Sequence, residues 1–211
     1  MRTIIPIVEG QGEVTAVPVL LRKLLWAQGV YDVAIPRPIN AHGSGGLARR
    51  LERFVELAQR DPRCDGVMVV QDGEGECPKE LARGYVARVR DSFLKHPVAV
   101  VIARCMYEAW LVASVPTIMP GVAPLEGDPE ALGDPKAWLD AQMRPGRAYK
   151  ETTDQESMTA DLDPELARTC RSFRRLESAL DFLLDCIRTD KTGISPDPSA
   201  TSGKDAGSGS G

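Results

Sequence analysis

Two short segments of the sequence place carboxylate side chains among glycines, directly after an apolar run. The first reads VEGQGE over residues 8–13, and the second reads QDGEGE over residues 71–76. The acids in these segments are Glu9, Glu13, Asp72 and Glu74, with Glu76 close by. If they converge, each pair of charges about 4 Å apart repels by on the order of 4 kcal/mol at an effective dielectric of about 20. Such a cluster either holds protons or binds cations.

The chemistry of the donors decides which cation would suit this cluster. All of the candidate ligands are hard carboxylate oxygens, and the chain has only 2 histidines and 5 cysteines, with no CxxC pair. That composition favours Mg²⁺ or Mn²⁺ over zinc. Two such ions roughly 4 Å apart can clamp the attacking and leaving oxygens of a phosphodiester, and Glu9 would then act as general base or acid. The competing interpretation is structural, because acids beside glycine are common in turns and at helix starts.

Hydrophobic patterning predicts the elements that would bring these acids together. Four runs rich in Val and Ile indicate buried parallel strands, at residues 3–8, 31–36, 66–71 and 97–103. Amphipathic stretches between them predict covering helices, at residues 14–28, 47–58 and 78–94. The alternation predicts an α/β, Rossmann-like fold with a central parallel sheet flanked by helices. A strand order of 2-1-3-4 puts Glu9 and Asp72 on neighbouring strands at the carboxyl edge, where open α/β sheets bind ligands.

The second half of the chain is typical of an extension added to that core. We divide the chain into an α/β core, a loop and helical C-terminal extension packed on the core, and a disordered tail, at residues 1–115, 116–188 and 189–211. Residues 115–135 are rich in Pro and Gly and predict a loop, whereas apolar spacing predicts a helix over residues 173–187. The tail has too few apolar side chains to offset the entropy of ordering it.

Composition narrows the class of protein. The formal net charge is −4, so the chain as a whole is not a polybasic nucleic-acid binder, and an anionic partner would need a local basic patch or metal ions. Five scattered cysteines suit a reducing cytosol. The first strand begins almost at once, so no signal peptide is expected, and no apolar run approaches the roughly 20 residues of a membrane span. The protein is therefore expected to be soluble and cytoplasmic.

The acids and their spacing resemble the Toprim fold, the topoisomerase–primase catalytic domain. That family has a Glu after its first strand and an Asp-x-Asp after its third, arranged around Mg²⁺, and Glu9 and Asp72-Gly73-Glu74 occupy those places here. The spacing of Glu9 and Glu13 is similar to that in Toprim nucleases of the overcoming-lysogenization-defect group. There both acids serve the metals, a lysine lies further on, and the domain is fused to an ATPase. This sequence departs in having Glu as its third acid, which changes the reach of that ligand, and in showing no ATPase domain.

Most of the chain outside the tail is also similar to the bacterial domain-of-unknown-function family 4276, itself Toprim-like. The similar segments are Val8–Glu13, Tyr107–Ala113, Tyr149–Gln155 and Arg171–Leu184. Together these resemblances imply a stand-alone Mg²⁺-dependent Toprim-type nuclease that hydrolyses DNA or RNA. They also imply that it is the effector subunit of a bacterial antiphage defence system and works with an ATPase partner.

Other residues extend the candidate site. Glu108 follows the fourth strand and is a candidate metal ligand, although an acid at a helix start is the structural alternative. Lys150, in the YKETTDQ segment, would stabilise transition-state charge as a catalytic residue, unless it is simply a solvated loop lysine. A basic cluster near the last helix is a candidate surface for a nucleic-acid backbone, against the alternative of a solvated or salt-bridged helix face. Its residues are Arg168, Arg171, Arg174 and Arg175.

The sequence leaves two other functions open. The chain could be a non-catalytic, metal-binding partner subunit whose task is to dock on an ATPase. It could also be a phosphatase or a nucleotidyl-transfer enzyme built on a similar α/β shelf. The sequence does not choose between DNA and RNA, and it leaves a homo-oligomer open.

Overall fold

The structure, a computed structural model, describes residues 1–90 and 94–196. Its central sheet is built on three long strands, β1 (Arg2–Val8), β4 (Gly66–Asp72) and β5 (Val98–Ala103). Nearly all of their residues are buried, as expected for apolar strands covered on both faces. The strand order is β2-β1-β4-β5-β6, β3 also pairs with β1, and these pairings are parallel. The predicted neighbours of the first strand are therefore confirmed.

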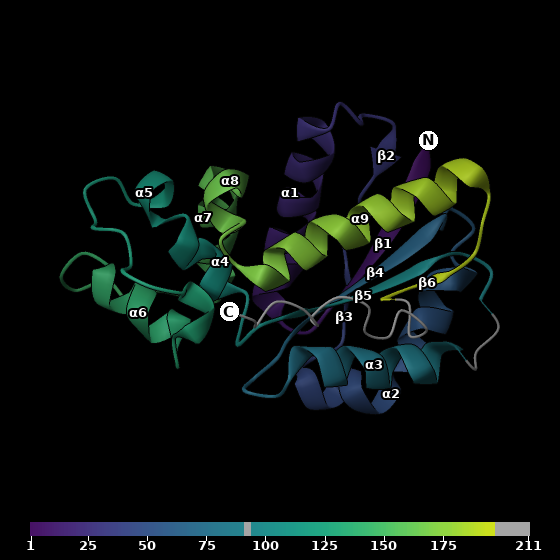
Figure 1. The fold of residues 1–211 in the computed structure, drawn as a ribbon, viewed down its shortest axis with the longest axis horizontal. Coiled ribbons are helices and arrows are strands. Elements are labelled where there is room, and N and C mark those ends of the chain that lie inside the picture. The colour runs from purple at the N-terminus through teal and green to yellow at the C-terminus, as the bar shows by residue number, and fades with distance from the viewer. Residues whose placement is uncertain (91–93, 197–211) are drawn as a thin grey trace, which may run out of the picture.

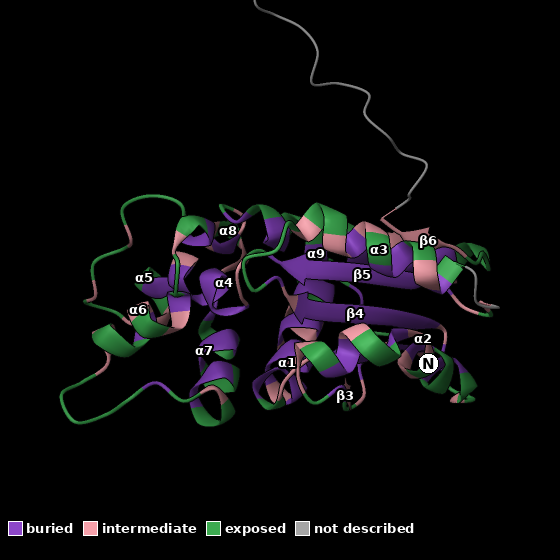
Figure 2. Ribbon diagram, turned by 90° about the horizontal axis from the view of Figure 1, so that it is seen from below, coloured by how far each residue is buried: buried purple, intermediate pink, exposed green. Residues whose placement is uncertain are grey.

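Two layers of helices cover the sheet (Figure 1). On one face lie α2 (Ser44–Arg60) and α3 (Pro78–Arg90), whose apolar side chains, such as Leu51 and Val86, form one core cluster with the strands. On the other face lie α1 (Gln11–Ala27) and α9 (Arg171–Thr189), which share a second cluster with the sheet. Figure 2 shows β4 and β5 coloured as buried. The protein thus has the predicted α/β, Rossmann-like arrangement.

Between β5 and α9 the chain forms a group of short helices, which lies on the left of Figure 1. Its elements are α4 (Glu108–Ala113), α5 (Val115–Ile118), η1 (Pro129–Ala131), α6 (Pro135–Gln142), the π-helical η2 (Glu151–Gln155), α7 (Glu156–Asp161) and α8 (Pro164–Ala167). Buried residues of this group, such as Leu139 and Leu162, belong to the same apolar cluster as α1 and α9. The extension and the sheet therefore share one core.

The first turn of α9 is fixed from two sides. Trp110 of α4 is fully buried, donates its indole N–H to Ser172 Oγ at 2.8 Å, and packs edge-on against Phe173. Glu130 of η1 is 4% exposed and accepts the backbone N–H groups of Arg171 at 2.7 Å and Ser172 at 2.8 Å. A carboxylate at this position satisfies free helix donors and complements the helix dipole.

Two predicted elements differ from the structure. The strand expected over residues 31–36 is interrupted, and two short strands, β2 (Val33–Ala34) and β3 (Ile39–Asn40), pair with opposite ends of β1. Pro36 and Pro38 lie between them, and proline has no N–H to give to a ladder. The loop expected over residues 115–135 contains the short helices α5 and η1.

The predicted start of the disordered tail is wrong. Beyond the end of α9, β6 (Ile194–Ser195) adds a strand to the edge of the sheet, where Ile194 pairs with Val98 of β5. A single β-branched residue, Ile194, is enough to form a strand here, because β5 supplies the hydrogen-bond partners. Residues 197–211 of the predicted tail, and residues 91–93 of the predicted third helix, lie outside the described residues. Within the described chain, no helix combines the length and the apolar character that a bilayer crossing requires.

Candidate functional site

The carboxyl ends of β1 and β4 bring Glu9 and Asp72 together. Glu9 follows the last residue of β1, and Asp72 is the last residue of β4, the neighbouring strand. Glu9 Oε2 accepts the backbone N–H of Asp72 across a distance of 3.3 Å. The two acids singled out at the ends of separate strands therefore share one corner of the sheet.

Asp72 also contacts the start of α4. Its Oδ1 accepts the backbone N–H of Tyr107 at 2.8 Å. The next residue, Glu108, is only 1% exposed and opens α4. Asp72 thus links the end of β4 to the first turn of the extension, and a second carboxylate is buried beside it.

Glu13 comes to the same region from α1. Its Oε2 accepts the backbone N–H of Gly10 at 3.0 Å, which gives it the structural role of a helix cap. The first turn of α1 is also close to η2, because a Cβ added at Gly12 would lie 2.2 Å from Gln155 Oε1. Gly12 therefore permits a close approach of the extension to the acids.

The electrostatics of the cluster are those of crowded carboxylates. Burial, followed by repulsion from Glu13 and Glu108, raises the pKa of Asp72 well above its ordinary value. Burial and then repulsion from Glu74 raise the pKa of Glu9 to about 7. Burial raises the pKa of Glu108 to about 7 and also raises the pKa of Glu13. In the absence of a cation, burial and mutual repulsion shift these acids toward the protonated form relative to exposed carboxylates.

The extension adds polar side chains that sequence reasoning missed. Tyr149 Oη donates to Glu108 Oε1 at 3.0 Å. Lys136 forms an ion pair with Glu151. Although burial lowers the pKa of Lys136, its ion pair with Glu151 and the nearby Glu108 raise that pKa overall. The available signal was the YKETTDQ segment, which contains Tyr149, Glu151 and Gln155, whereas no sequence pattern marked Lys136.

The other residues predicted for the site lie at the exposed rim of the acidic cluster or away from it. Glu74 is exposed, has a positive φ of 44°, and adds repulsion to Glu9. Glu76 is exposed as well. Lys150 is exposed, and among the described residues its side chain forms neither a hydrogen bond nor an ion pair. The catalytic role of Lys150 stays a prediction.

The predicted nucleic-acid contacts Arg171, Arg174 and Arg175 are exposed in the first turns of α9. The guanidinium of Arg174 donates to the backbone carbonyls of Arg168 and Thr169, which precede that helix. Arg168 itself is paired with acids of α8 and α9. Arg168 and Arg174 therefore have structural contacts, and the binding role of Arg171, Arg174 and Arg175 stays a prediction.

The donor atoms of the acidic cluster are of the type that binds a hard divalent cation. As the side chains stand, no three Asp, Glu, His or Cys groups within the described residues are drawn close enough to hold an ion. The available donors are all carboxylate oxygens, from Glu9, Glu13, Asp72 and Glu108. Lys136 supplies one positive charge among them, so negative charge is in excess, and Mg²⁺ or Mn²⁺ would balance it.

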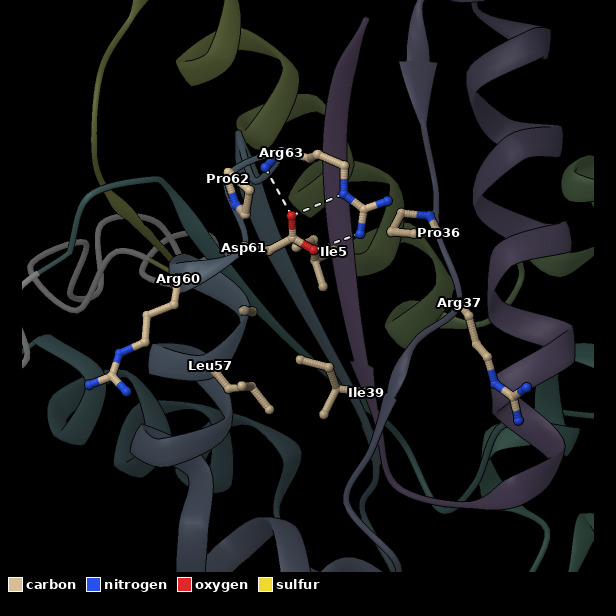
Figure 3. Close-up of a pocket in the computed structure, with 10 residues that line it drawn as sticks. Ile5, Pro36, Arg37, Ile39, Leu57, Arg60, Asp61, Pro62 and Arg63 are labelled. Carbon is tan, nitrogen blue, oxygen red and sulfur yellow. Dashed lines mark hydrogen bonds and ion pairs between the residues drawn. The ribbon is translucent and has the colours of Figure 1, made fainter.

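A groove of about 580 Å³ lies away from the acids, between the end of α2 and the segment that joins β2 to β3 (Figure 3). Its floor is apolar and includes Ile5 and Ile39. Asp61 binds Arg63 at its rim with two side-chain hydrogen bonds. None of the acids of the candidate site lines this groove.

We expect the metal-free protein to lose stability as the pH rises from about 4.5 to about 7. In that window the native state binds more protons than the unfolded state, because the folded pKa values of Glu9 and Glu108 lie above the unfolded value, so the free energy of unfolding falls with pH. For Glu108 alone the difference corresponds to on the order of 3 kcal/mol. Melting temperatures in EDTA at about pH 5 and about pH 7 measure the effect.

Glu108→Gln isolates this contribution, because it keeps an acceptor for Tyr149 and removes the titrating group. That variant should lose less stability between the two pH values than the wild type, whereas Glu126→Gln, which changes an exposed loop acid, should behave like the wild type. Added Mg²⁺ or Mn²⁺ should raise the melting temperature most at the higher pH. Equal pH dependence in the wild type and the Glu108 variant would contradict the expectation.

A comparison with known protein families gives a match that covers the candidate site and the extension. A family model described as a domain of unknown function (DUF4276) matches residues 8–181. The match includes the four converging acids and the residues of the extension that surround them. No curated protein and no solved structure matches the chain.

Proposed function

This chain belongs to the DUF4276 family, a domain family of unknown function, and we propose that it is a Mg²⁺- or Mn²⁺-dependent nuclease of the Toprim type that hydrolyses phosphodiester bonds in DNA or RNA. The observation that carries the proposal is the meeting of Glu9 and Asp72 at adjacent strand ends, 3.3 Å apart between Glu9 Oε2 and the Asp72 nitrogen. Glu13 and Glu108 add buried carboxylates. An oxygen-only donor set with excess negative charge suits a divalent ion, and phosphodiester hydrolysis is chemistry that such ions support.

The role of each side chain follows from its surroundings. A bound divalent ion would supply neutralisation of charge on the phosphodiester. Asp72, Glu13 and Glu108 would hold it. Glu9 is more exposed than Glu13 and Glu108, so water reaches it, and it would accept or return a proton as general base or acid. Lys136 would stabilise the negative charge that develops on the phosphoryl group.

The nuclease is proposed to act in the cytoplasm, as the effector subunit of an antiphage defence system that includes a separate ATPase. Support comes from the similarity of the Glu9 and Glu13 spacing to Toprim nucleases that are fused to an ATPase. An ATPase encoded beside this chain would be the first partner to add to an assay.

A cleavage assay tests this function and separates the two candidate lysines. Lys136→Ala is expected to lower metal-dependent cleavage by about 100-fold, because it removes the cation nearest the acids. Lys150→Ala, the matched control in the same extension, should stay near wild type, because that side chain is exposed. The assay uses labelled single- and double-stranded DNA and RNA with Mg²⁺, Mn²⁺ or EDTA, in the presence and absence of the ATPase.

Cleavage by the wild type that EDTA abolishes would support the nuclease. If only the Lys150 variant loses cleavage, the catalytic lysine is Lys150 and not Lys136, and the proposal of a metal-dependent nuclease is unaffected. If the folded wild type cleaves nothing under any condition, the nuclease is refuted. Metal-induced stabilisation and tight ATPase binding in that case would identify a non-catalytic partner subunit.

A further inference from the structure

Three arginines on the exposed side of α2 carry charge that is not balanced locally. Arg49, Arg50 and Arg53 are all exposed, and we refer to them as the arginine patch. None of the three guanidinium groups forms an ion pair or a hydrogen bond with another described residue, and that of Arg50 lies over the ring of Phe54, 5.3 Å from its centroid. The whole chain has a formal net charge of −4, so this concentration of positive charge is local.

The acids of α2 are positioned to neutralise the patch but bind other partners. Glu56 lies three residues beyond Arg53, at a spacing that permits an ion pair along a helix. Glu52 lies three residues beyond Arg49, but the non-helical backbone at Arg50, with φ −128° and ψ 21°, kinks α2 between them. Glu52 is instead held by Arg88 of α3 through two hydrogen bonds, at 2.6 and 2.7 Å. Glu56 is paired with Arg60. The patch therefore keeps its full charge in the free protein.

Two guanidinium groups of the patch, those of Arg49 and Arg50, lie near the end of α2 where positive charge is least favourable. The first turn of α2 contains no acid, and the N-terminus of a helix is the positive end of its dipole. The guanidinium groups fold back toward this turn: Arg49 Nη2 is 3.7 Å from the position that a Cβ would take at Gly45, and Arg50 Nη2 is 3.5 Å from that position at Gly46. Arg49 and Arg50 therefore place two cations beside a positive helix end, and Arg53 adds a third further along α2, so a bound anion would relieve their repulsion.

The helix that carries the patch begins beside the acids of the candidate site. Gly43, which caps α2, donates its backbone N–H to the carbonyl of Glu9 at 2.8 Å. The first turn of α2 therefore begins beside β1, at the carboxyl edge of the sheet. Arg49 is only five residues into α2, which corresponds to a rise of about 8 Å along the helix axis.

We propose that the arginine patch binds the phosphodiester backbone of a nucleic acid strand and leads that strand to the acids at the sheet edge. Guanidinium groups bind phosphate oxygens in a planar, two-pronged geometry, and unpaired ones do so without first breaking an ion pair. Binding of the polyanion follows from the patch alone. That the bound strand is the substrate rests on the nuclease proposed above.

Other basic groups are less suited to this role. At the groove of Figure 3, Arg63 is bound by Asp61 and Arg60 is paired with Glu56, so their charge is already balanced. On α9, Arg174 is engaged with backbone carbonyls. The proposal is confined to the arginine patch, which gathers three unpaired guanidinium groups. The α9 arginines are the rival surface, because the exposed Arg171 and Arg175 also form neither an ion pair nor a side-chain hydrogen bond with another described residue.

Nucleic-acid binding in EDTA tests the proposal without any need for cleavage. The combined Arg49→Ala, Arg50→Ala and Arg53→Ala variant should bind labelled DNA or RNA about tenfold or more weakly at low salt, with the slope of log affinity against log salt reduced by about 2 to 3. The matched control, Arg37→Ala, Lys79→Ala and Arg188→Ala, removes the same total charge at exposed positions outside the patch and should retain near wild-type affinity. The Arg171→Ala, Arg174→Ala and Arg175→Ala variant tests the rival surface on α9. Replacing the patch by three lysines should retain most of the binding, because the charge is kept.

Melting curves show whether each variant folds, and the alanine variant of the patch is expected to melt at the wild-type temperature or above. Parallel titrations with single-stranded DNA, duplex DNA and RNA identify the preferred strand. Unchanged affinity in the patch variant, or loss of affinity only in the α9 variant, overturns the proposal, as does a wild type that binds no nucleic acid. If the wild type binds nucleic acid through the patch but cleaves nothing under any condition, this inference holds and the nuclease is refuted. If the patch variant binds and cleaves nucleic acid like the wild type, the nuclease holds and this inference is refuted.

Discussion

The Asp72→Asn protein is expected to lose about 100-fold or more of its metal-dependent cleavage, while its metal-free form melts at the wild-type temperature or higher. Asparagine keeps the size of the side chain and an oxygen that can accept the Tyr107 N–H, but it removes an anionic ligand. Changes to groups that merely support metal ligands cost about 10- to 100-fold, so removal of a ligand charge belongs at the upper end. The metal-free protein gains because the neutral amide ends the repulsion from Glu13 and Glu108.

Cleavage rates with Mg²⁺ or Mn²⁺, and melting curves in EDTA, measure the two effects side by side. Glu76→Gln is the matched control, because it removes the same charge from the same segment at an exposed position. That variant should cleave at the wild-type rate. Undiminished cleavage by a folded Asp72→Asn protein would show that the acids at the sheet edge are not the active site.

Removing the carboxylate of Glu130 is expected to cost about 2 to 4 kcal/mol of folding free energy. In the Glu130→Ala protein, the backbone N–H groups of Arg171 and Ser172 lose their acceptor, and a buried donor without a partner costs about 1 to 3 kcal/mol. The favourable interaction of a negative charge with the α9 dipole is lost as well. For a domain of this size, the melting temperature should fall by roughly 5 to 15 °C.

Thermal and urea unfolding of the purified variants measure this loss. Glu130→Gln retains one acceptor oxygen and should lose about half as much stability. Glu126→Ala, an exposed acid in the same connecting segment, should melt like the wild type. A Glu130→Ala protein within about a degree of the wild type would mean that water or another group replaces the carboxylate at the start of α9.

The long strands of the sheet were predictable because their signal is local. Val67–Val70 and Val98–Val101 are continuous apolar runs rich in valine, a pattern typical of strands covered on both faces. The convergence of Glu9 and Asp72 then followed from the rule that parallel strands end at the same edge. The interruption between β2 and β3 was not predicted, although the prolines that cause it, Pro36 and Pro38, are present in the sequence. The apolar residues around them gave the pattern of one continuous strand.

The remaining part of the candidate site was not predictable for a different reason. Lys136 and Glu151 belong to helices with no marked periodicity, and only tertiary packing brings them to Glu108. Sequence reasoning preferred Lys150, which lies in a recognisable segment, over Lys136, which does not. The strand at Ile194 was missed because a two-residue strand has no pattern of its own and depends on the partner that it joins.

The shared core of the sheet and the extension has a consequence for the way in which the chain is made. α9 is synthesised after every other long element, yet it covers β4 and β5 and shares its core with α1 and α4. A nascent chain on the ribosome therefore carries Glu9 and Asp72 long before it can bury the surfaces behind them. Lys136, Glu151 and the helix that closes the core all arrive later. We expect the acidic corner to reach its final geometry only after α9 has been synthesised and has packed on the sheet, so that chains without α9 are inert.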